Sequence, residues 1–354
     1  MRCPTLGELP PPPAGKTGWP WTQDAAPPPD RRSDGRAWPR VSVVTPSYNQ
    51  GRFLEETIRS VLLQGYPDLE YLVIDGGSED ESLEIIRKYE PWLAYWISEP
   101  DQGQSHAINK GWTRATGDIV AYVNSDDCYL VDAIPTAAEE FSRDPLPGMV
   151  YGTAVIVDEM GEPLKDWEAR PFDVKIMFTV GSVVPQPATF FSRTALDAVG
   201  YLDENWQQIL DYEFCTRVGT RFPTVCVPRT LARFRNHPAS KTRSQFEGTA
   251  RELIHFFENF SCDRIPEREL EMIKRTALSR VHYELALGYL PQERLETRKV
   301  LRHVVQSVLL EPRFALGRPL LTAHIAKQVV IDCLRPVVGH VRNLGMRRCS
   351  WEAR

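Results

Sequence analysis

Four polar residues, Asn124, Ser125, Asp126 and Asp127, follow a run of β-branched and aromatic residues that predicts a buried strand. Adjacent carboxylates at the end of a strand repel each other, so a bound cation would stabilise them. Carboxylate oxygens suit Mg²⁺ and Mn²⁺, which often bind one or two carboxylates together with substrate phosphates. Taken alone, the same four residues also fit a turn that caps the following helix.

A second candidate position is Asp75, which ends another predicted strand and is followed by Gly76 and Gly77. A carboxylate there could accept hydrogen bonds from a nucleobase or a ribose, and the glycines would let a ligand approach the backbone. A simple helix start, with Ser78 or Asp80 as the cap, explains the same residues.

The elements that must position these residues alternate along the chain. Short apolar runs predict strands over 41–47, 69–75 and 116–127, and helical spacing predicts helices over 53–62, 80–89 and 104–114. This alternation is typical of βαβ units and a parallel sheet, which binds ligands at the carboxyl ends of its strands. The loops at those ends are 46–51, 75–82 and 124–128.

The remainder of the chain has a different pattern. Strands are predicted over 149–158, 187–193 and 224–235, with a helix over 209–218. Beyond residue 262 the helical periodicity is long, over 267–287 and 292–310. We therefore expect an α/β catalytic domain over 39–262 and a helical region over 263–354.

Composition separates a third region. Of the 29 prolines in 354 residues, ten lie in the first 40, and nothing in 1–38 has a helical or strand period, so this leader is expected to be disordered. The net charge of −5 argues against a nucleic-acid partner. No apolar run reaches the ~20 residues that span a bilayer. The seven cysteines form no C-x-x-C pair and favour free thiols in the cytoplasm.

Several ordered segments now show a resemblance. The segment from VSVVTPSYNQG to LVIDGGSEDES resembles the opening of a family 2 glycosyltransferase, and the similarity continues through SEPDQGQSHAINKG, GDIVAYVNSDD, PQPATFFSR, LDYEFCTRV and FRNHPASKT. It covers residues 40–245. The resemblance implies a GT-A fold: a Rossmann-like, nucleotide-binding half with a mixed central sheet, joined to an acceptor-binding half.

The resemblance also implies roles for individual residues on the donor side. Asp75 matches the carboxylate that reads the base, and Asp101 matches a second acidic position near the donor. The full set expected to bind the donor is Thr45, Pro46, Tyr48, Asp75, Asp101, Asn124, Ser125 and Lys241.

The expected metal, Mg²⁺ or Mn²⁺, would be held by Asp126 and His237. Asn124 stands where the family's Asp-x-Asp motif has its first aspartate. An asparagine still offers an oxygen to the ribose, so the departure need not abolish function. It is compatible with a weaker or differently arranged metal site.

On the acceptor side, Asp211 matches the family's catalytic base. The acid that usually precedes it is Leu210 here, a second departure. Glu213 is near in sequence, although positions two apart on a helix diverge. Glu213 and Gln186 are expected to shape the acceptor pocket.

Together these positions predict an inverting, hexosyl-transferring enzyme that moves a sugar from a nucleotide sugar, expected to be a UDP-sugar, to a saccharide or lipid-linked acceptor in polysaccharide biosynthesis. The departures at Asn124 and Leu210 keep a non-catalytic nucleotide-sugar-binding protein as an alternative. A nucleotidyltransferase is a second alternative, but TPSYNQG lacks the Gly-rich, basic loop of that class.

The C-terminal region carries ten Lys/Arg between 298 and 348 against only Glu311 and Asp332. One interpretation is a solvated basic face of a helical subdomain. The other is peripheral contact with the inner face of a membrane, because basic residues attract anionic lipid and Leu309, Leu310 and Phe314 could insert.

Overall fold

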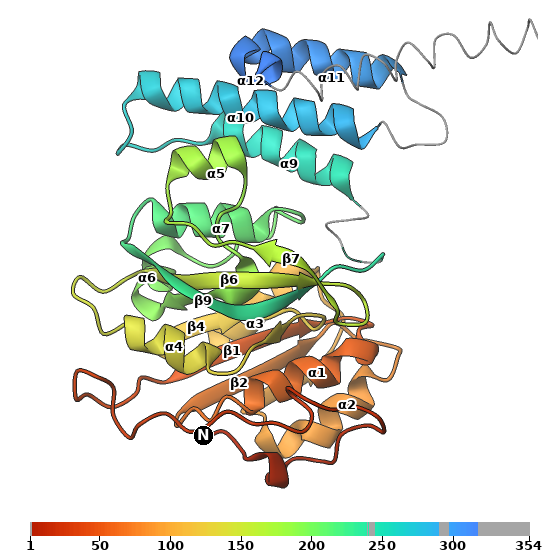
Figure 1. Ribbon diagram of the computed structural model, residues 1–354, viewed down its shortest axis with the longest axis vertical. Coiled ribbons are helices and arrows are strands. Elements are labelled where there is room, and N and C mark those ends of the chain that lie inside the picture. Colours follow the sequence, from red (N-terminus) through yellow and green to blue (C-terminus); the bar gives the residue numbers. More distant parts are fainter. Residues whose placement is uncertain (1, 239, 241–244, 290–296, 318–354) are drawn as a thin grey trace, which may run out of the picture. The chain divides into compact units, whose positions relative to one another are not determined.

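The computed structural model describes residues 2–238, 240, 245–289 and 297–317. The chain divides into two compact units, Met1–Ser244 and Gln245–Arg354 (Figure 1). The division falls earlier than the expected boundary after residue 262, because helix α9 (Phe246–Asn259) packs on α10 (Glu267–Gly288) of the second unit.

The first half of the first unit is a parallel sheet in the order β3-β2-β1-β4. Its strands are β1 (Val41–Ser47), β2 (Leu69–Asp75), β3 (Tyr95–Ser98) and β4 (Ile119–Tyr122). The helices between them are α1 (Gly51–Leu62), α2 (Ser82–Tyr89) and α3 (Gln104–Arg114), with the short turn η2 (Glu90–Trp92) after α2. The predicted βαβ alternation is thus confirmed.

Burial explains why these segments form strands. Every residue of β1 is buried, and β2 has one half-buried residue, as expected for central strands covered on both faces. Helix α3 lies very close to β1: a Cβ added to Gly111 would come within 2.5 Å of a Val44 methyl carbon. That close packing requires glycine at position 111.

The sheet continues in mixed orientation from β4 to β8, β6, β9 and β5, and β7 pairs with the edge of β6. These strands are β5 (Cys128–Tyr129), β6 (Met149–Val157), β7 (Pro163–Trp167), β8 (Thr189–Ser192) and β9 (Thr224–Arg235). The accompanying helices are α4 (Ala133–Glu140), α5 (Val174–Val180), η3 (Gln186–Ala188), α6 (Arg193–Val199) and α7 (Leu210–Gly219). Nine strands therefore form one curled sheet within the described part of the chain (Figure 1).

The N-terminal segment 2–38 differs from the disordered leader expected from its composition. It has one short turn, η1 (Leu6–Glu8), yet Cys3, Trp19 and Trp21 are buried. The Trp19 indole donates to the carbonyl of Tyr129 at 2.7 Å. Proline-rich composition predicted disorder because it forbids a helix or strand ladder, but it does not prevent an irregular chain from packing its tryptophans on a core.

Arg59 on α1 fixes this segment. Its fully buried guanidinium donates to the carbonyls of Pro10, Pro20 and Trp21 at 2.8–3.0 Å, and to the hydroxyl of Tyr89 at 3.0 Å. A charge buried in this way is stable only when its donors are satisfied, and the leader supplies most of the acceptors. The segment is therefore part of the first unit.

The second unit is helical, as predicted for the C-terminal region. Besides α9 and α10 it contains α11 (Thr297–Leu310) and α12 (Pro312–Leu316). Helix α11 exposes Leu301, Val305 and Leu309, which recur every four residues and so lie along one side of the helix. Within the described ranges, no helix is long and apolar enough to cross a membrane.

Candidate active site

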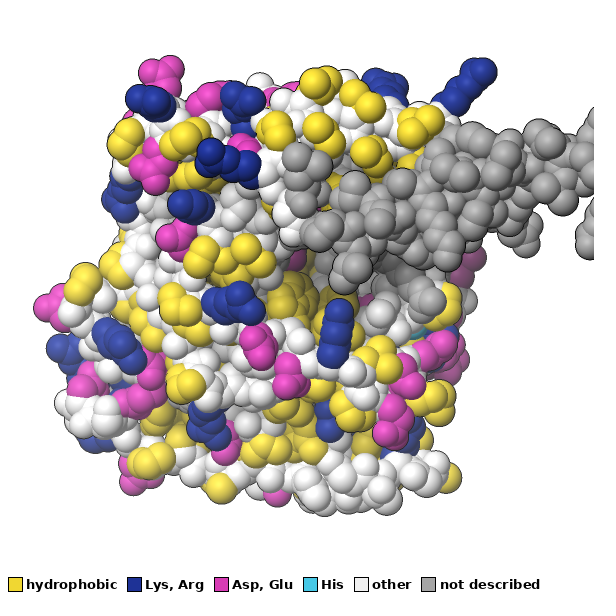
Figure 2. Space-filling view, turned by 45° about the horizontal axis from the view of Figure 1, so that its top comes forward, with side chains coloured by type: hydrophobic (Ala, Val, Ile, Leu, Met, Phe, Trp, Pro, Cys, Tyr) yellow, Lys and Arg dark blue, Asp and Glu magenta, His cyan; other side chains and the backbone are white. Residues whose placement is uncertain are grey.

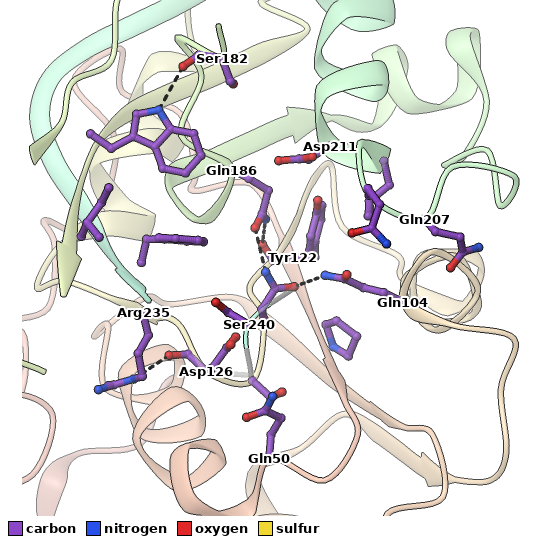
Figure 3. A pocket seen from close by; sticks show the side chains of 18 of the residues that line it. Gln50, Gln104, Tyr122, Asp126, Ser182, Gln186, Gln207, Asp211, Arg235 and Ser240 are labelled. Atoms are coloured by element: carbon purple, nitrogen blue, oxygen red, sulfur yellow. Dashed lines mark hydrogen bonds between the residues drawn. The ribbon is translucent and has the colours of Figure 1, made fainter. Parts of the chain in front are cut away.

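A cavity of about 910 Å³ lies in the first unit, over the carboxyl ends of the parallel strands (Figure 3). One wall comes from the loops after β1, β3 and β4, a second from the segment before α7 and its first turn, and a third from β6, β7 and β9. Eight of the residues expected to form the site line this cavity: Pro46, Tyr48, Asp101, Asn124, Ser125, Asp126, Gln186 and Asp211. His237 is buried behind Asp126 and contacts it.

Asn124 lines the cavity and is held in a network of amides. Its Oδ1 accepts from Gln104 at 2.6 Å, and its Nδ2 donates to Oε1 of Gln186 and to Oδ2 of Asp127, both at 3.2 Å. Gln186 in turn donates to the carbonyl of Tyr122 at 3.0 Å. An aspartate at position 124 would lack the donor that two of these contacts need.

Asp127 is buried beneath the cavity and does not line it. Its Oδ1 accepts from the backbone N–H of Arg235 at 2.8 Å, while Asn124 donates to Oδ2. Burial, reinforced by the neighbouring carboxylate of Asp126, raises the pKa of Asp127 well above its usual value. This carboxyl is therefore a structural anchor between β4 and β9.

Asp126 and His237 form the pair expected to bind metal. Nε2 of His237 lies 3.0 Å from Oδ2 of Asp126, and the imidazole is fully buried against Phe53. Two neighbouring ligands of an octahedral ion with bonds of about 2.1 Å are separated by about 3.0 Å, so the spacing fits Mg²⁺ or Mn²⁺.

The position of the proton on the His237 imidazole argues against direct metal binding by this residue. Nη2 of Arg52 lies 3.2 Å from Nδ1 of His237, and a guanidinium can only donate, so the imidazole proton is on Nε2 and points at Asp126. An ion bound to Nε2 would have to replace that proton. Asp126 fits a metal directly, with His237 as its orienting partner. No group of three or more His, Cys, Asp or Glu side chains suited to a metal occurs among the described residues.

Asp75 lies outside the cavity lining. Its two carboxylate oxygens accept from the backbone of Gly77 and Ser78 and from the hydroxyls of Ser78 and Ser98, at 2.5–3.1 Å. All of the side chain is buried. These contacts fix the turn after β2. The alternative from the sequence, a helix start capped by Ser78 or Asp80, differs from the structure, in which α2 begins at Ser82 after Glu81.

Asp101 is the carboxylate that lines the cavity on this side. Its Oδ1 accepts from the backbone N–H of Gly103 at 2.8 Å. A Cβ at Gly76 would lie 2.8 Å from Oδ2 of Asp101 and 3.4 Å from the ring of Tyr48. Glycine at 76 thus leaves the space that the side chain of Asp101 occupies.

Of the other residues expected on the donor side, some line the cavity and some do not. Tyr48 is 62% exposed and lines the cavity with Pro46 and Ser125. Thr45 is fully buried and its hydroxyl is 3.0 Å from that of Tyr71, so it supports β1 from below. Lys241 lies outside the described residues, next to Ser240, which lines the cavity.

Asp211 enters the cavity from the first turn of α7 (Figure 3). Burial raises the pKa of its carboxyl above the usual value, which is the change that makes a carboxylate a better general base. Glu213 does not line the cavity: both of its oxygens accept from Arg217 at 2.8 Å. The divergence of positions two apart on a helix accounts for the difference.

Several cavity residues were not expected from the sequence. Gln104, Gln207 and Gln208 carry amides into it, and Arg235 donates to the carbonyl of Asp126 at 3.0 Å. Gln104 lies within the EPDQGQS segment of the resemblance, so its place near the donor site could have been predicted from that segment. Trp167, on β7, belonged to no motif.

Proteins named as glycosyltransferases are similar in sequence to this chain. The profile of the family described as Glycosyl transferase family 2 matches residues 42–198. An uncharacterized glycosyltransferase of Mycobacterium tuberculosis (strain H37Rv) is 33% identical over 199 residues, which is 54% of this chain and 72% of that protein. TuaG of Bacillus subtilis, named as a glycosyltransferase of teichuronic acid biosynthesis, is 36% identical over 104 residues, covering 28% of this chain and 41% of TuaG.

Solved structures share the fold. Residues 1–349 of S. aureus TarS, in complex with UDP-GlcNAc, align with a TM-score of 0.59 and 19% identity, covering 83% of this chain and 89% of that one. The mannosyltransferase PcManGT of Pyrobaculum calidifontis, in complex with GDP-Man and Mn²⁺, aligns with a TM-score of 0.50 and 21% identity, covering 88% and 90%. With its GT-A fold and these relatives, the chain belongs to the family 2 glycosyltransferases.

Proposed function

We propose that this glycosyltransferase moves a sugar, with inversion, from a nucleotide sugar to a hydroxyl of a saccharide or lipid-linked acceptor in the synthesis of a cell-surface polysaccharide. The observation that carries the proposal is that one cavity holds both Asp211, with a raised pKa, and Asp126 (Figure 3). A base for the acceptor and an anchor for the donor are thus within one space large enough for both substrates.

The nucleotide would lie on the wall made by Pro46, Tyr48 and Asp101. We assign base recognition to Asp101 and not to Asp75, because Asp101 lines the cavity whereas the oxygens of Asp75 are used within its own turn. Tyr48 is exposed there and offers a ring for stacking. A carboxylate can accept from a base N–H, which is consistent with uracil and a UDP-sugar.

Asp126 would hold Mg²⁺ or Mn²⁺, with His237 beside it and the donor diphosphate completing the coordination. The ion, when bound, neutralises charge on the departing diphosphate. Arg235 and the Asn124 network keep Asp126 in place, since they fix the backbone on either side of it. The Mn²⁺ in the complex of the mannosyltransferase with the same fold supports this assignment.

Asp211 would accept the proton of the acceptor hydroxyl while that oxygen attacks the anomeric carbon from the face opposite the nucleotide. The hydroxyl proton moves to the Asp211 carboxylate, the new C–O bond forms, and the nucleoside diphosphate leaves. Positioned base catalysis of this kind contributes roughly 10²–10⁴-fold to rate. Gln186 and the amides of Gln207 and Gln208 offer hydrogen bonds to sugar hydroxyls nearby.

One observation favours the alternative of a non-catalytic nucleotide-sugar-binding protein. Asn124 removes one carboxylate from the Asp-x-Asp position and gives its side chain to structural contacts. The two functions differ in turnover: a binding protein would bind UDP-sugars and release no UDP.

For the second unit we propose contact with an anionic membrane surface. Leu301 is 47%, Val305 52% and Leu309 68% exposed, and the exposed Arg298 and Arg302 lie on the same helix. An amphipathic helix with basic neighbours suits the interface of an anionic bilayer. Such contact would bring the enzyme to a lipid-linked acceptor. Figure 2 shows apolar side chains on the visible surface of the molecule. A cytoplasmic location stays a prediction.

The test is a panel of nucleotide sugars, including UDP-glucose, UDP-GlcNAc and GDP-mannose, assayed for binding by thermal shift and for release of nucleoside diphosphate with and without Mn²⁺. We expect one UDP-sugar to stabilise the protein and to be hydrolysed or transferred only with the metal. Binding without any turnover would support the binding protein, and no binding would contradict both functions.

A further inference from the structure

Apart from Arg235, which holds Asp126, the wall of the cavity made by β6, β7 and β9 has no part in the proposed donor site or base. It places Trp167 and Phe234 at the cavity surface, from strands that both pair with β6. Their ring centroids are 5.5 Å apart with an interplanar angle of 84°. Two aromatic side chains at a cavity surface are a substantial apolar area that a ligand can cover.

The indole of Trp167 is held in place before any ligand binds. Its N–H donates to the carbonyl of Ser182 at 3.1 Å, and its ring packs against the hydrophobic core (Figure 3, bond at Ser182). Because the N–H is already used, the indole offers a ligand only its apolar surface. A fixed ring also loses little conformational entropy when a ligand covers it.

The four charged residues of β7 and of the segment after it are balanced in charge. Lys165 and Arg170 are opposed by Asp166 and Glu168, and all four line the cavity. Nη2 of Arg170 lies 3.7 Å from a carboxylate oxygen of Glu168. Two cationic donors and two anionic acceptors, with no net charge among the four, suit a ligand rich in hydroxyls better than an anionic one.

We propose that Trp167 and Phe234 form a platform for one pyranose ring of a neutral saccharide acceptor. The C–H face of the ring would lie on the aromatic surface, and its hydroxyls would meet the charged residues of β7 and the segment that follows. This inference rests on the proposed function, in which the acceptor hydroxyl must reach Asp211 in the same cavity. The proposed function allows either a saccharide or a lipid-linked acceptor. The platform adds that the part of the acceptor bound next to the reacting hydroxyl is a neutral sugar ring.

The experiment uses the full chain with UDP and Mn²⁺, and methyl pyranosides of glucose, galactose, mannose and N-acetylglucosamine as probes. Saturation-transfer NMR reports which ring protons approach the protein, and titration gives the dissociation constant. We expect at least one pyranoside to bind through its C–H protons, Trp167→Ala to weaken it by ~10-fold or more, and Trp167→Phe to retain most of the affinity. Phe234→Leu keeps apolar volume without the ring, and should weaken binding as well.

UDP binding by calorimetry is the control in every variant and should stay within ~2-fold of wild type. The proposal is overturned if the wild-type protein binds UDP but none of the pyranosides, or if Trp167→Ala and Phe234→Leu bind them like the wild type. A failure of the proposed function would look different, because no nucleotide sugar would bind or turn over in any variant.

Discussion

Nδ2 of Asn124 donates to the buried carboxyl of Asp127 at 3.2 Å, so the asparagine that departs from the family's Asp-x-Asp motif is matched to the residue three positions later. The second donor of the same amide serves Gln186. The departure is therefore compensated within the loop, and in the proposed site Asp126 would be the residue that holds the metal.

Restoring the family motif by Asn124→Asp should reduce stability and activity. The change would bring a second carboxylate to the buried carboxyl of Asp127 and remove a donor, and an unsatisfied buried polar group costs about 1–3 kcal/mol. Urea unfolding at neutral pH measures the loss. The matched control is the swap Asn124→Asp with Asp127→Asn, which restores an amide–carboxylate pair and should recover part of the loss. Equal stability of Asn124→Asp and wild type would contradict this account.

Asp211→Asn should lower kcat by about 10²–10⁴-fold and leave nucleotide binding nearly intact. Since burial raises the pKa of Asp211, the wild-type rate should fall on the acid side at a higher pH than an ordinary carboxyl would give. Below that pKa the base is protonated and cannot accept the hydroxyl proton; above it the rate is retained. Initial rates against pH report this limb.

The neighbouring carboxylate on the same helix provides the control. Glu213→Gln should stay within ~10-fold of the wild-type rate, because Glu213 contacts Arg217 outside the cavity. If Glu213→Gln were inactive and Asp211→Asn active, the two assignments would have to be exchanged.

Asp126→Asn should remove the dependence of UDP binding on Mn²⁺. Loss of the charged ligand weakens the binding of the ion. His237→Gln should reduce the metal dependence less, because the imidazole proton points at Asp126 and leaves the metal to that carboxylate. Calorimetric titration of UDP with Mn²⁺ and with EDTA gives the metal-dependent part of the affinity. Persistent enhancement by Mn²⁺ in Asp126→Asn would place the ion elsewhere.

Arg59→Met should destabilise the first unit by ~3 kcal/mol or more, because it leaves several buried carbonyls without a donor. Limited proteolysis should then cut within residues 2–38. The exposed Arg87→Met on α2 is the matched control and should change stability by less than about 0.5 kcal/mol. Protection of the leader in Arg59→Met would show that other contacts suffice.

Replacing Leu301, Val305 and Leu309 together by glutamine should abolish sedimentation with anionic vesicles, since the apolar stripe of α11 would be lost. Met272→Gln on α10, also exposed at 58%, is the control and should not affect it. Donor turnover in solution should be unchanged by the triple replacement. Binding to vesicles by the triple variant at wild-type level would exclude this helix as the contact.

The parallel half of the fold could be predicted from sequence because its central strands are buried on both faces. The runs 41–47 and 69–75 match β1 and β2. In the mixed half of the sheet, the run 224–235 matches β9. Strand β7 could not be predicted from the sequence. Its residues, Pro163–Trp167, are largely exposed at an edge of the sheet and include charged residues in place of an alternating apolar pattern. The leader could not either, because its order depends on the distant Arg59.

Some of the site residues could likewise be predicted from the sequence, and others could not. Asp126, Asp101 and Asp211 follow recognisable segments and line one cavity. Asp75 stands in an equally recognisable segment, but sequence does not tell a ligand carboxylate from one that holds its own turn. Trp167 could not be anticipated, because its position over the cavity depends on the pairing of β7 with β6.

Among the strands that the structure describes, β7 pairs with β6 and lies at an edge. The cavity wall that it supplies is distinct in sequence from the loops that line the donor side. With the acceptor platform where we propose it, substitutions, insertions or exchanges in 158–170 would alter the choice of acceptor without disturbing the binding of the donor. Such an arrangement would let related enzymes diversify their products through one exposed hairpin while the nucleotide-binding framework is inherited unchanged.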